Sequence, residues 1–443
     1  MKTFAHLLRR NSSTYPRLTL KLQNANPVVF TVYTAITAFC LYTCVYAFRK
    51  SFTAATFDGE ILLGIDYKVW LVSAQVVGYS ISKFLGIRLI SEVESSQRKN
   101  GILLVSIISG LSWLGFGITQ GPFSIVFLFI NGLTLGLVWG LVFGYLEGRT
   151  VTEVLGAALS VSFIFSSGLC RSIGAYIMTD WSVSERWMPW VVSCLFFAPL
   201  LLFLILLDSV PPPNKSDVES RTLRRPMLKA DRSRFIKKFL PGIILFVIAY
   251  MLLTVYRDFR DNFAAEIWRE LGAGNDAGIY TKTEIPIAFA VLFAMGMLMI
   301  IKDNRLALMI NHFVILCGMV TIGVATFAFQ FAFINASLWM TLVGLGLYLG
   351  YVPFNSIFFD RMLAAFQFVG TVGFIMYIAD AFGYLGSVSV LFVKEFANIR
   401  MSWLDFFTRS GYIVSIAGSL LTAASMVYFS LKFLTSKKAP QYK

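Results

Sequence analysis

The stretch 209–238, SVPPPNKSDVESRTLRRPMLKADRSRFIKK, divides the sequence into two apolar halves. It contains three consecutive prolines at 211–213 and nine basic residues from Lys215 to Lys238. Clusters of proline and charge are typical of a connection between folded segments. Because long apolar runs lie on both sides, the stretch predicts a chain of two comparable halves joined by a basic linker.

Twelve long apolar runs flank this linker, six on each side. Each has about 20 residues, the length that an α-helix needs to cross the hydrocarbon core of a bilayer. None alternates in polarity as a barrel strand would, so all are predicted to be helices. The predicted spans are 28–56, 67–90, 101–119, 123–146, 154–179 and 187–208 before the linker, and 239–268, 282–301, 307–329, 338–359, 367–392 and 407–434 after it.

The composition also indicates a membrane protein. Of 443 residues, 57% are hydrophobic and 14% are charged, against about 45–50% and about 25% in soluble domains. The net charge of +14 comes from basic residues that lie mainly between apolar runs, so nucleic-acid binding is not expected. No cofactor or catalytic motif occurs, so we expect no enzyme activity, cofactor or metal. The cysteines lie inside apolar runs and are predicted to be free: Cys40, Cys44, Cys170, Cys194 and Cys317.

Basic residues further predict the orientation. The linker carries the largest excess of Lys and Arg, which favours the cytoplasmic side. Six spans on either side then place both termini in the cytoplasm. We therefore predict a monomeric multi-pass protein of the bacterial inner membrane. Its expected parts are a cytoplasmic tail 1–26, a six-helix bundle 27–208, the linker 209–238, a second six-helix bundle 239–434 and a cytoplasmic tail 435–443.

A weak internal repeat relates the two halves. Arg49 and Phe52 in the first half match Arg260 and Phe263 in the second, at an offset of about 211 residues. Two parallel six-helix halves with a site near the middle of the membrane are the architecture of the major facilitator superfamily. The predicted fold is thus all-α and polytopic, with two pseudo-symmetric bundles. The repeat extends, at an offset of about 212, to Gly132-Leu133, Arg149 and Gly174 against Gly344-Leu345, Arg361 and Gly386.

Charged residues within the predicted spans are candidates for a functional site. Each costs about 2.5–3.5 kcal/mol at a helix centre on insertion scales, so it needs a partner or a role. The candidate substrate contacts are Arg49, Lys83, Arg171, Arg257 and Arg260, and the candidate coupling or charge-pairing residues are Asp261, Glu284 and Asp380. For Arg49 the alternative is a helix that ends at Phe48, with the side chain at the outer interface.

The seventh predicted span holds two arginines and two aspartates within two turns. Arg257 and Asp261 are four residues apart, so they can pair on one helix face. That pairing would leave one arginine to meet an anion; the alternative is a solvated helix end. Asp380 can either neutralise a basic residue or carry a coupling proton. Elsewhere, the four-residue spacing of Gly132, Gly136, Gly140 and Gly144 predicts close helix packing in the fourth span.

Two of these stretches resemble a known family. Tyr46-Ala-Phe-Arg49-Lys50-Ser-Phe52 and Gly78-Tyr-Ser-Ile-Ser-Lys83-Phe84 resemble the first and second helices of the organophosphate:phosphate antiporters. Tyr256-Arg257 and Glu284-Ile-Pro286 are similar to parts of the seventh and eighth helices. The resemblance implies that Arg49 and either Arg257 or Arg260 bind the substrate phosphate from opposite halves, with Lys83 nearby. The fifth-helix histidine of that family has no match, and Arg171 lies in that span instead.

We therefore expect a secondary active transporter for a small anion, either an organophosphate or phosphate, that works by alternating access. The planar guanidinium group suits phosphate oxygens. Two alternatives remain. One is a proton-coupled symporter of an organic acid or other small solute, with Asp380 or Glu284 as the proton carrier. The other is a transporter-like sensor that signals through the basic stretch 209–238.

Overall fold

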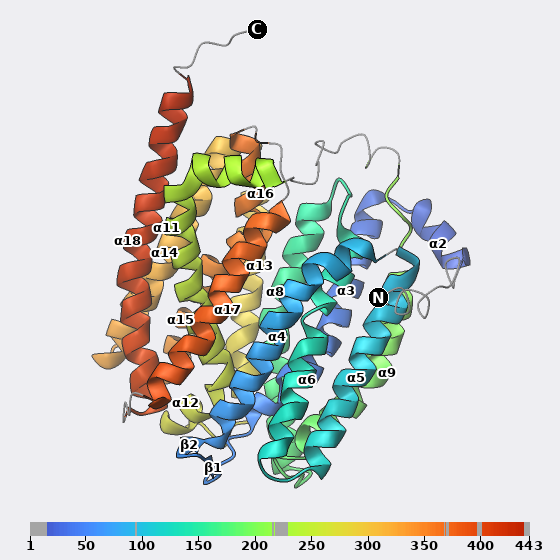
Figure 1. Ribbon diagram of the computed structural model, residues 1–443, viewed down its shortest axis with the longest axis vertical. Coiled ribbons are helices and arrows are strands. Elements are labelled where there is room, and N and C mark those ends of the chain that lie inside the picture. The colour runs from blue at the N-terminus through green and yellow to red at the C-terminus, as the bar shows by residue number, and fades with distance from the viewer. Residues whose placement is uncertain are drawn as a thin grey trace. The chain divides into compact units, whose positions relative to one another are not determined.

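The computed structural model describes residues 16–93, 95–214, 217, 229–366, 368, 372–396 and 401–437. Most of this part of the chain is helical (Figure 1). The predicted linker and the two predicted tails lie partly outside the described residues. The structure therefore leaves the assignment of these segments to the cytoplasm as a prediction.

The helices before the linker are α2 (Pro16–Gln23), α3 (Pro27–Lys50), α4 (Tyr67–Glu92), α5 (Arg98–Ile118), α6 (Ile125–Leu135), α7 (Val138–Leu146), α8 (Thr152–Thr179) and α9 (Met188–Asp208). Three short 3-10 turns accompany them: η1 (Ser51–Ala54), η2 (Ser95–Gln97) and η3 (Pro122–Ser124). The loop between α3 and α4 contains a small antiparallel hairpin of β1 (Ile61–Leu62) and β2 (Ile65–Asp66).

The helices after the linker are α11 (Lys229–Asn262), α12 (Ala264–Glu270), α13 (Ile279–Met299), α14 (Asn304–Gln330), α15 (Ala336–Ser356), α16 (Phe358–Ala365), α17 (Val372–Phe396) and α18 (Trp403–Lys437). Helix α11 begins inside the predicted linker. Several helices begin at a capping side chain, as sequence rules favour. The side chain of Asn26 accepts a hydrogen bond from the Val28 amide, and Asp303 and Asn335 cap α14 and α15 in the same way.

Ten helical segments within the described residues are long and apolar enough to cross a membrane. The two other predicted spans, 67–90 and 367–392, coincide with α4 and α17, which carry Lys83 and Asp380 in their interiors. The ten segments are Pro27–Ala54, Ser95–Ile118, Pro122–Leu146, Thr152–Thr179, Met188–Asp208, Ser233–Asn262, Ile279–Met299, Asn304–Gln330, Ala336–Ser356 and Trp403–Leu434.

The apolar side chains that remain exposed fit a lipid environment. On α18, Ile413, Ile416, Leu420 and Val427 are all more than half exposed. Their spacing of three, four and seven residues places them on one face of the helix. A soluble protein rarely exposes such a continuous apolar face, whereas lipid solvates it. The chain is therefore a multi-pass membrane protein.

Four predicted spans contain a break that the sequence did not predict: 28–56, 123–146, 239–268 and 338–359. Helix α3 ends at Lys50 and continues as the 3-10 turn η1, and α11 ends at Asn262 before α12 begins. The predicted spans 28–56 and 239–268 are each a long helix followed by a short separate one. Arg49 and Lys50 still belong to α3, so the helix ends at Lys50 and not at Phe48, and the depth of Arg49 in the membrane stays a prediction.

The chain divides into two compact units. Unit 1 comprises Met1–Arg221, Asp261–Ala288 and Val388–Arg400, and unit 2 comprises Thr222–Arg260, Phe289–Ser387 and Met401–Lys443. Helices α11, α13 and α17 contribute residues to both units.

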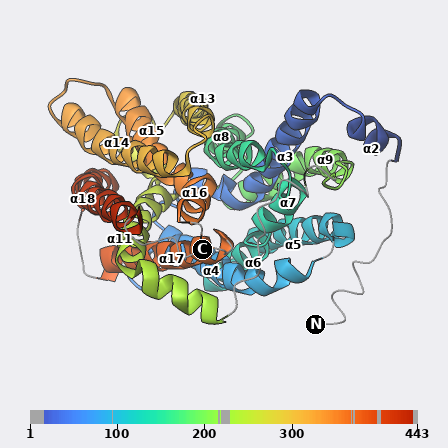
Figure 2. The same cartoon turned by 90° about the horizontal axis from the view of Figure 1, so that it is seen from above.

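Glycines bring pairs of helices into close contact within each unit. In unit 1, a Cβ atom at Gly132 of α6 would overlap the carbonyl oxygen of Gln75 on α4, and one at Gly78 would overlap that of Phe129. In unit 2, α14 and α15 lie side by side (Figure 2), and a Cβ atom at Gly318 would overlap the carbonyl oxygen of Gly346. The packing role predicted for Gly132 is thus confirmed.

Candidate functional site

In unit 1, Arg49 stacks on an aromatic ring near the middle of a neighbouring helix. Its guanidinium carbon lies 3.6 Å from the centroid of the Tyr79 ring, a close cation–π contact. Tyr79 is twelve residues into the 26-residue helix α4, or about 18 Å along a helix of about 39 Å. Arg49 is partly exposed, whereas Tyr79 is buried. The guanidinium group therefore lies at the middle depth of α4.

Lys83 lies one turn further along α4 and contacts the same ring. Its Nζ atom is 5.3 Å from the Tyr79 centroid and 5.4 Å from that of Trp139 on α7. Lys83 is also partly exposed. Arg49, Tyr79, Lys83 and Trp139 together form what we call the Tyr79 cluster, in which two cations share one aromatic ring.

Two predicted site residues from distant segments pair in unit 1. The Nη2 atom of Arg171 on α8 lies 3.2 Å from Oδ1 of Asp261, and Ser167 donates a hydrogen bond of 3.1 Å to the same oxygen. Both charged side chains are buried. A buried pair of this kind neutralises both charges, so the arginine that we predicted as a substrate contact is engaged by a carboxylate of its own unit.

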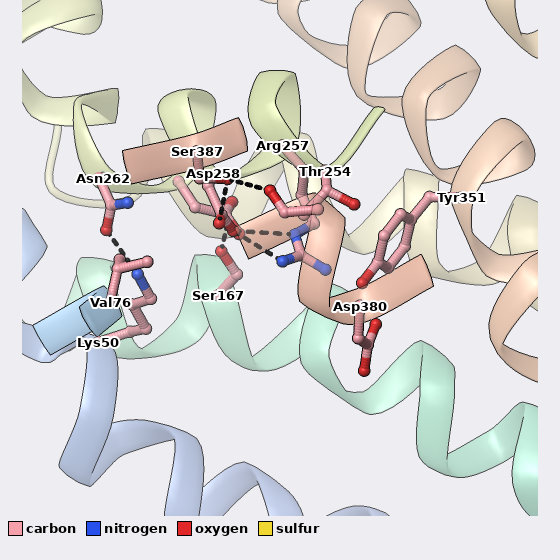
Figure 3. A network of polar contacts seen from close by, with 12 residues as sticks. Lys50, Val76, Ser167, Thr254, Arg257, Asp258, Asn262, Tyr351, Asp380 and Ser387 are labelled. Atoms are coloured by element: carbon pink, nitrogen blue, oxygen red, sulfur yellow. Dashed lines mark hydrogen bonds and ion pairs between the residues drawn. The ribbon is translucent and has the colours of Figure 1, made fainter. Parts of the chain in front are cut away.

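Two further polar contacts in unit 1 lie outside the predicted substrate-contact and charge-pairing residues. Nζ of Lys68 lies 2.6 Å from Glu266, and both side chains are buried. Nζ of Lys50 donates a 2.5 Å hydrogen bond to Oδ1 of Asn262 (Figure 3). Glu284, a predicted charge-pairing residue, is buried on α13. It packs closely against Gly168, because a Cβ atom added to that glycine would lie 2.8 Å from the Cβ atom of Glu284.

In unit 2, Arg257 pairs with the residue next to it. Its Nη2 atom lies 2.7 Å from Oδ1 of Asp258, and Ser387 donates a 2.8 Å hydrogen bond to the other carboxylate oxygen (Figure 3). The guanidinium carbon also lies 4.3 Å from the centroid of the Tyr351 ring. The helical spacing had favoured Asp261 as the partner of Arg257, but Asp261 pairs with Arg171 in unit 1.

Asp380 belongs to a hydrogen-bonded group that also contains Tyr351. The hydroxyl of Tyr250 donates a 2.6 Å hydrogen bond to Oδ1 of Asp380 and lies 3.0 Å from the hydroxyl of Tyr351. The two tyrosine rings are stacked, with their centroids 5.1 Å apart. Tyr351 therefore connects Asp380 with the ring-stacked Arg257 inside unit 2.

Arg260 is buried on α11, with 2% of its surface exposed. Its Nη2 atom donates a 3.2 Å hydrogen bond to the carbonyl oxygen of Met340 on α15. The structure thus places all three predicted site residues of unit 2, Arg257, Arg260 and Asp380, in its interior.

The loop between α3 and α4 carries an exposed ion pair. Asp58 contacts Arg269 of α12 through its carboxylate, and the hydroxyl of Thr56 donates a hydrogen bond of 3.0 Å to it. Partial burial opposes ionisation of Asp58, but the hydrogen bonds from Arg269 and Thr56 hold the pKa of this carboxyl below its ordinary value. Both side chains are at least half exposed, so the pair is a solvated one.

Within the described ranges, no group of three or more His, Cys, Asp or Glu side chains is placed to hold a metal ion. The five cysteines are free.

Comparison with known proteins gives a family and a fold. A family model described as a family of unknown function, DUF5690, matches residues 51–432. No curated protein is a significant match. A crystal structure of a D-xylose–proton symporter is 17% identical, with a TM-score of 0.58, over 91% of this chain and 97% of that one. The xylose transporter XylE from E. coli, in a partially occluded inward-open conformation, is 16% identical, with a TM-score of 0.56, over 89% and 97%.

This likeness is one of fold. A structure of XylE described as a major facilitator proton:xylose symporter is 14% identical, with a TM-score of 0.57, over 90% of this chain and 95% of that one. The all-α polytopic fold predicted from the sequence, that of the major facilitator superfamily, is confirmed. These neighbours are described as transporters, and the expectation that this protein is not an enzyme stays a prediction. They are symporters, so they do not support the narrower resemblance to organophosphate:phosphate antiporters.

Proposed function

Because the chain belongs to the family of unknown function DUF5690 and has the major facilitator fold, we propose that it is a secondary transporter of a small anionic solute. The proposed substrate class is an organophosphate or inorganic phosphate. The proposed mechanism is alternating access of the two halves around the bound anion.

The observation that carries this proposal is the Tyr79 cluster. Arg49 on α3 and Lys83 on α4 both contact the ring of Tyr79, and both are partly exposed. A guanidinium and an ammonium that contact the same ring offer two cationic groups to one bound anion. A guanidinium can hold two phosphate oxygens at once, while an ammonium acts as a point charge. The cluster thus offers both modes of phosphate recognition.

In the second half, our candidate for a substrate contact is Arg260. It is the counterpart of Arg49 in the sequence repeat and lies at the same place, just before the break in its helix. Arg257 is the weaker candidate, since Asp258 already contacts its guanidinium group. Arg171 is reassigned to charge pairing with Asp261 for the same reason.

Binding to the purified protein tests this proposal. Calorimetry in detergent should detect inorganic phosphate and glycerol 3-phosphate but not glycerol or D-xylose. Arg49→Leu and Lys83→Leu each remove one cationic contact to the bound anion. Each variant should therefore bind the anion roughly tenfold or more weakly. Lys282→Gln is the control, because Lys282 is exposed and pairs with Asp276. Tighter binding of D-xylose than of either anion, or unchanged anion affinity in both cluster variants, would overturn the assignment.

A second candidate function, proton-coupled symport of an organic acid or other small solute, is favoured by one observation. Asp380 is a buried carboxylate with a tyrosine hydroxyl 2.6 Å away, an arrangement that can hold or release a proton. The solved structures that resemble this chain are proton symporters. Uptake into proteoliposomes driven by a pH gradient, abolished by Asp380→Asn and retained in Asp276→Asn, would establish this function. Uptake that is indifferent to the gradient would exclude it.

A further inference from the structure

Side chains from three neighbouring helices hold the carbonyl oxygens at the end of α3. Trp113 of α5 donates a 2.5 Å hydrogen bond to the carbonyl oxygen of Phe48, and Asn131 of α6 donates one of 3.1 Å to the same oxygen. Gln75 of α4 donates a 2.8 Å hydrogen bond to the carbonyl oxygen of Arg49. The last carbonyls of a helix have no partner within it, and lipid supplies none. These side chains therefore make the break after α3 possible.

The donors are themselves connected. Nε2 of Gln75 also donates a 2.9 Å hydrogen bond to Oδ1 of Asn131. Nδ2 of Asn131 in turn donates a 2.7 Å hydrogen bond to the hydroxyl of Ser109. All three side chains are fully buried. A buried polar network whose members bond to one another is rigid, because each lost hydrogen bond would leave a polar group unsatisfied.

The close approach of α4 and α6 brings this network together. Gly132 follows Asn131 directly, and a side chain there would overlap the backbone carbonyl of Gln75. The same holds for Gly78 against the carbonyl of Phe129. Two glycines thus allow the contact between helices that the hydrogen bond from Gln75 to Asn131 requires.

Helix α4 holds both the backbone and the side chain of Arg49. Gln75, which binds the backbone carbonyl, and Tyr79, which carries the guanidinium group, are four residues apart, and Lys83 is four residues further along. Residues at this spacing lie on one face of a helix. Side chains also point toward the N-terminus of their own helix, so Arg49 at the end of α3 reaches back to the middle of α4.

We propose that Asn131 and Gln75 are positioning residues that hold Arg49 on the face of Tyr79 for anion binding. The expected effect on anion binding rests on the proposed function, whereas the contacts that hold Arg49 do not depend on it. Neither residue needs to touch the substrate. Loss of Asn131 would leave the Phe48 carbonyl with the hydrogen bond from Trp113 and would remove the acceptor that orients the Gln75 amide beside the Arg49 carbonyl.

The chain offers a matched control for Asn131. Asn311 of α14 is also a fully buried asparagine in a membrane helix, and its Nδ2 atom donates to the carbonyl oxygen of Ala307 in the same helix. Replacing either by leucine removes a buried amide of the same size. Only the change at Asn131 acts on the end of α3.

The first experiment measures the position of residue 49 without any substrate. A single cysteine is introduced as Arg49→Cys in a protein whose five native cysteines have been replaced, and its rate of reaction with a methanethiosulfonate ethylammonium reagent is followed. Loss of hydrogen bonds should change that rate roughly fivefold or more in Asn131→Leu, and less than about twofold in Asn311→Leu. Equal rates in both variants would overturn the positioning role, whether or not the protein binds anions.

The second experiment is a double-mutant cycle on inorganic phosphate binding by the full-length protein. Asn131→Leu should weaken binding roughly tenfold in the wild-type background and less than about twofold in the Arg49→Leu background. Equal effects in both backgrounds would mean that Asn131 acts on overall packing and not through Arg49. If the wild-type protein binds no phosphate, the proposed function fails, and the cysteine-labelling result alone decides the positioning role. Gln75→Leu should reproduce the pattern of Asn131→Leu in both experiments.

Discussion

The ends of α3 and α11 carry the same sequence pattern but different chemistry. Both helices break shortly after an arginine, at Arg49 and at Arg260, and a phenylalanine follows three residues later in each. At the end of α3, neighbouring helices bind the backbone carbonyls and the arginine lies on Tyr79. Near the end of α11, Arg257 is held by a carboxylate and a tyrosine ring. The breaks therefore fall at positions that the repeat relates, but the repeat does not predict how the charges are paired.

Under the proposed function, this difference assigns a binding role to Arg49 and a structural one to Arg257. The Tyr79 cluster contains two cations around one ring, whereas Arg257 and Asp258 form a compact neutral pair with Ser387. Binding of an anion to Arg257 would require its contact with Asp258 to open. On this basis, changes at Arg49 should act mainly on binding, and changes at Asp258 mainly on stability.

The largest effect is expected from Asp258→Leu. It leaves the Arg257 charge buried without its carboxylate, which should lower the free energy of unfolding by about 3–5 kcal/mol. The double variant Arg257→Leu/Asp258→Leu removes both charges and should recover most of that loss. Unfolding in detergent, followed by circular dichroism, measures both. A double variant as unstable as the single one would contradict the view that this pair is structural.

A smaller effect on stability and a larger one on binding are expected from Arg49→Leu. Arg49 is partly exposed and its contact with Tyr79 is a cation–π one, so the change should alter the free energy of unfolding by about 1 kcal/mol or less. The affinity for inorganic phosphate should nevertheless fall roughly tenfold or more, as in the binding test above. An Arg49→Leu protein that unfolds as readily as Asp258→Leu would show that the two helix ends do not differ in role.

An intermediate effect is expected from the ring that the two cations share. Tyr79→Leu removes the cation–π contact of Arg49, which is worth about 0.5–2 kcal/mol, so phosphate affinity should fall roughly two- to thirtyfold. Tyr79→Phe keeps the ring and should bind close to wild type. Calorimetric titration compares the two. Equal losses in both variants would indicate that the hydroxyl, and not the face of the ring, supports the site.

The smallest effect concerns the exposed pair of Asp58 and Arg269. Hydrogen bonds from Arg269 and Thr56 hold the pKa of Asp58 below its ordinary value. The contact therefore stabilises the folded protein above the unfolded pKa of about 3.9, and this stabilisation is lost as the pH falls through the lower pKa of the folded state. Because both side chains are largely solvated, the contribution should stay below about 1 kcal/mol. The free energy of unfolding should therefore differ between pH 7 and pH 3 by slightly less in Arg269→Gln than in wild type. A larger pH dependence in that variant would contradict the assignment.

The sequence predicts the helices well because they follow from composition alone. All twelve predicted spans are helical over most of their described length, since long apolar runs have no other way to satisfy their backbone in lipid. The break after Lys50 was missed because its backbone is satisfied by Gln75 and Asn131, which belong to other helices. No local pattern around Lys50 records these donors.

The charge partners could not be predicted for a similar reason. Lys68 and Glu266 are 198 residues apart, and Arg171 and Asp261 are 90 apart, so no helical spacing relates them. Adjacent side chains on a helix face different directions, which is why Asp258 was passed over as the partner of Arg257. The side chain of Arg257 is long enough to fold back along its own helix and reach the carboxylate of Asp258.

Uptake of radiolabelled inorganic phosphate into proteoliposomes is the most direct test of an anion transporter built on the Tyr79 cluster. The account predicts saturable uptake by the wild-type protein and by Lys282→Gln, and roughly tenfold weaker apparent affinity in Arg49→Leu and Lys83→Leu. Competition by glycerol 3-phosphate, but not by glycerol, should accompany it. Wild-type proteoliposomes that take up D-xylose with a pH gradient while ignoring both phosphates would contradict it.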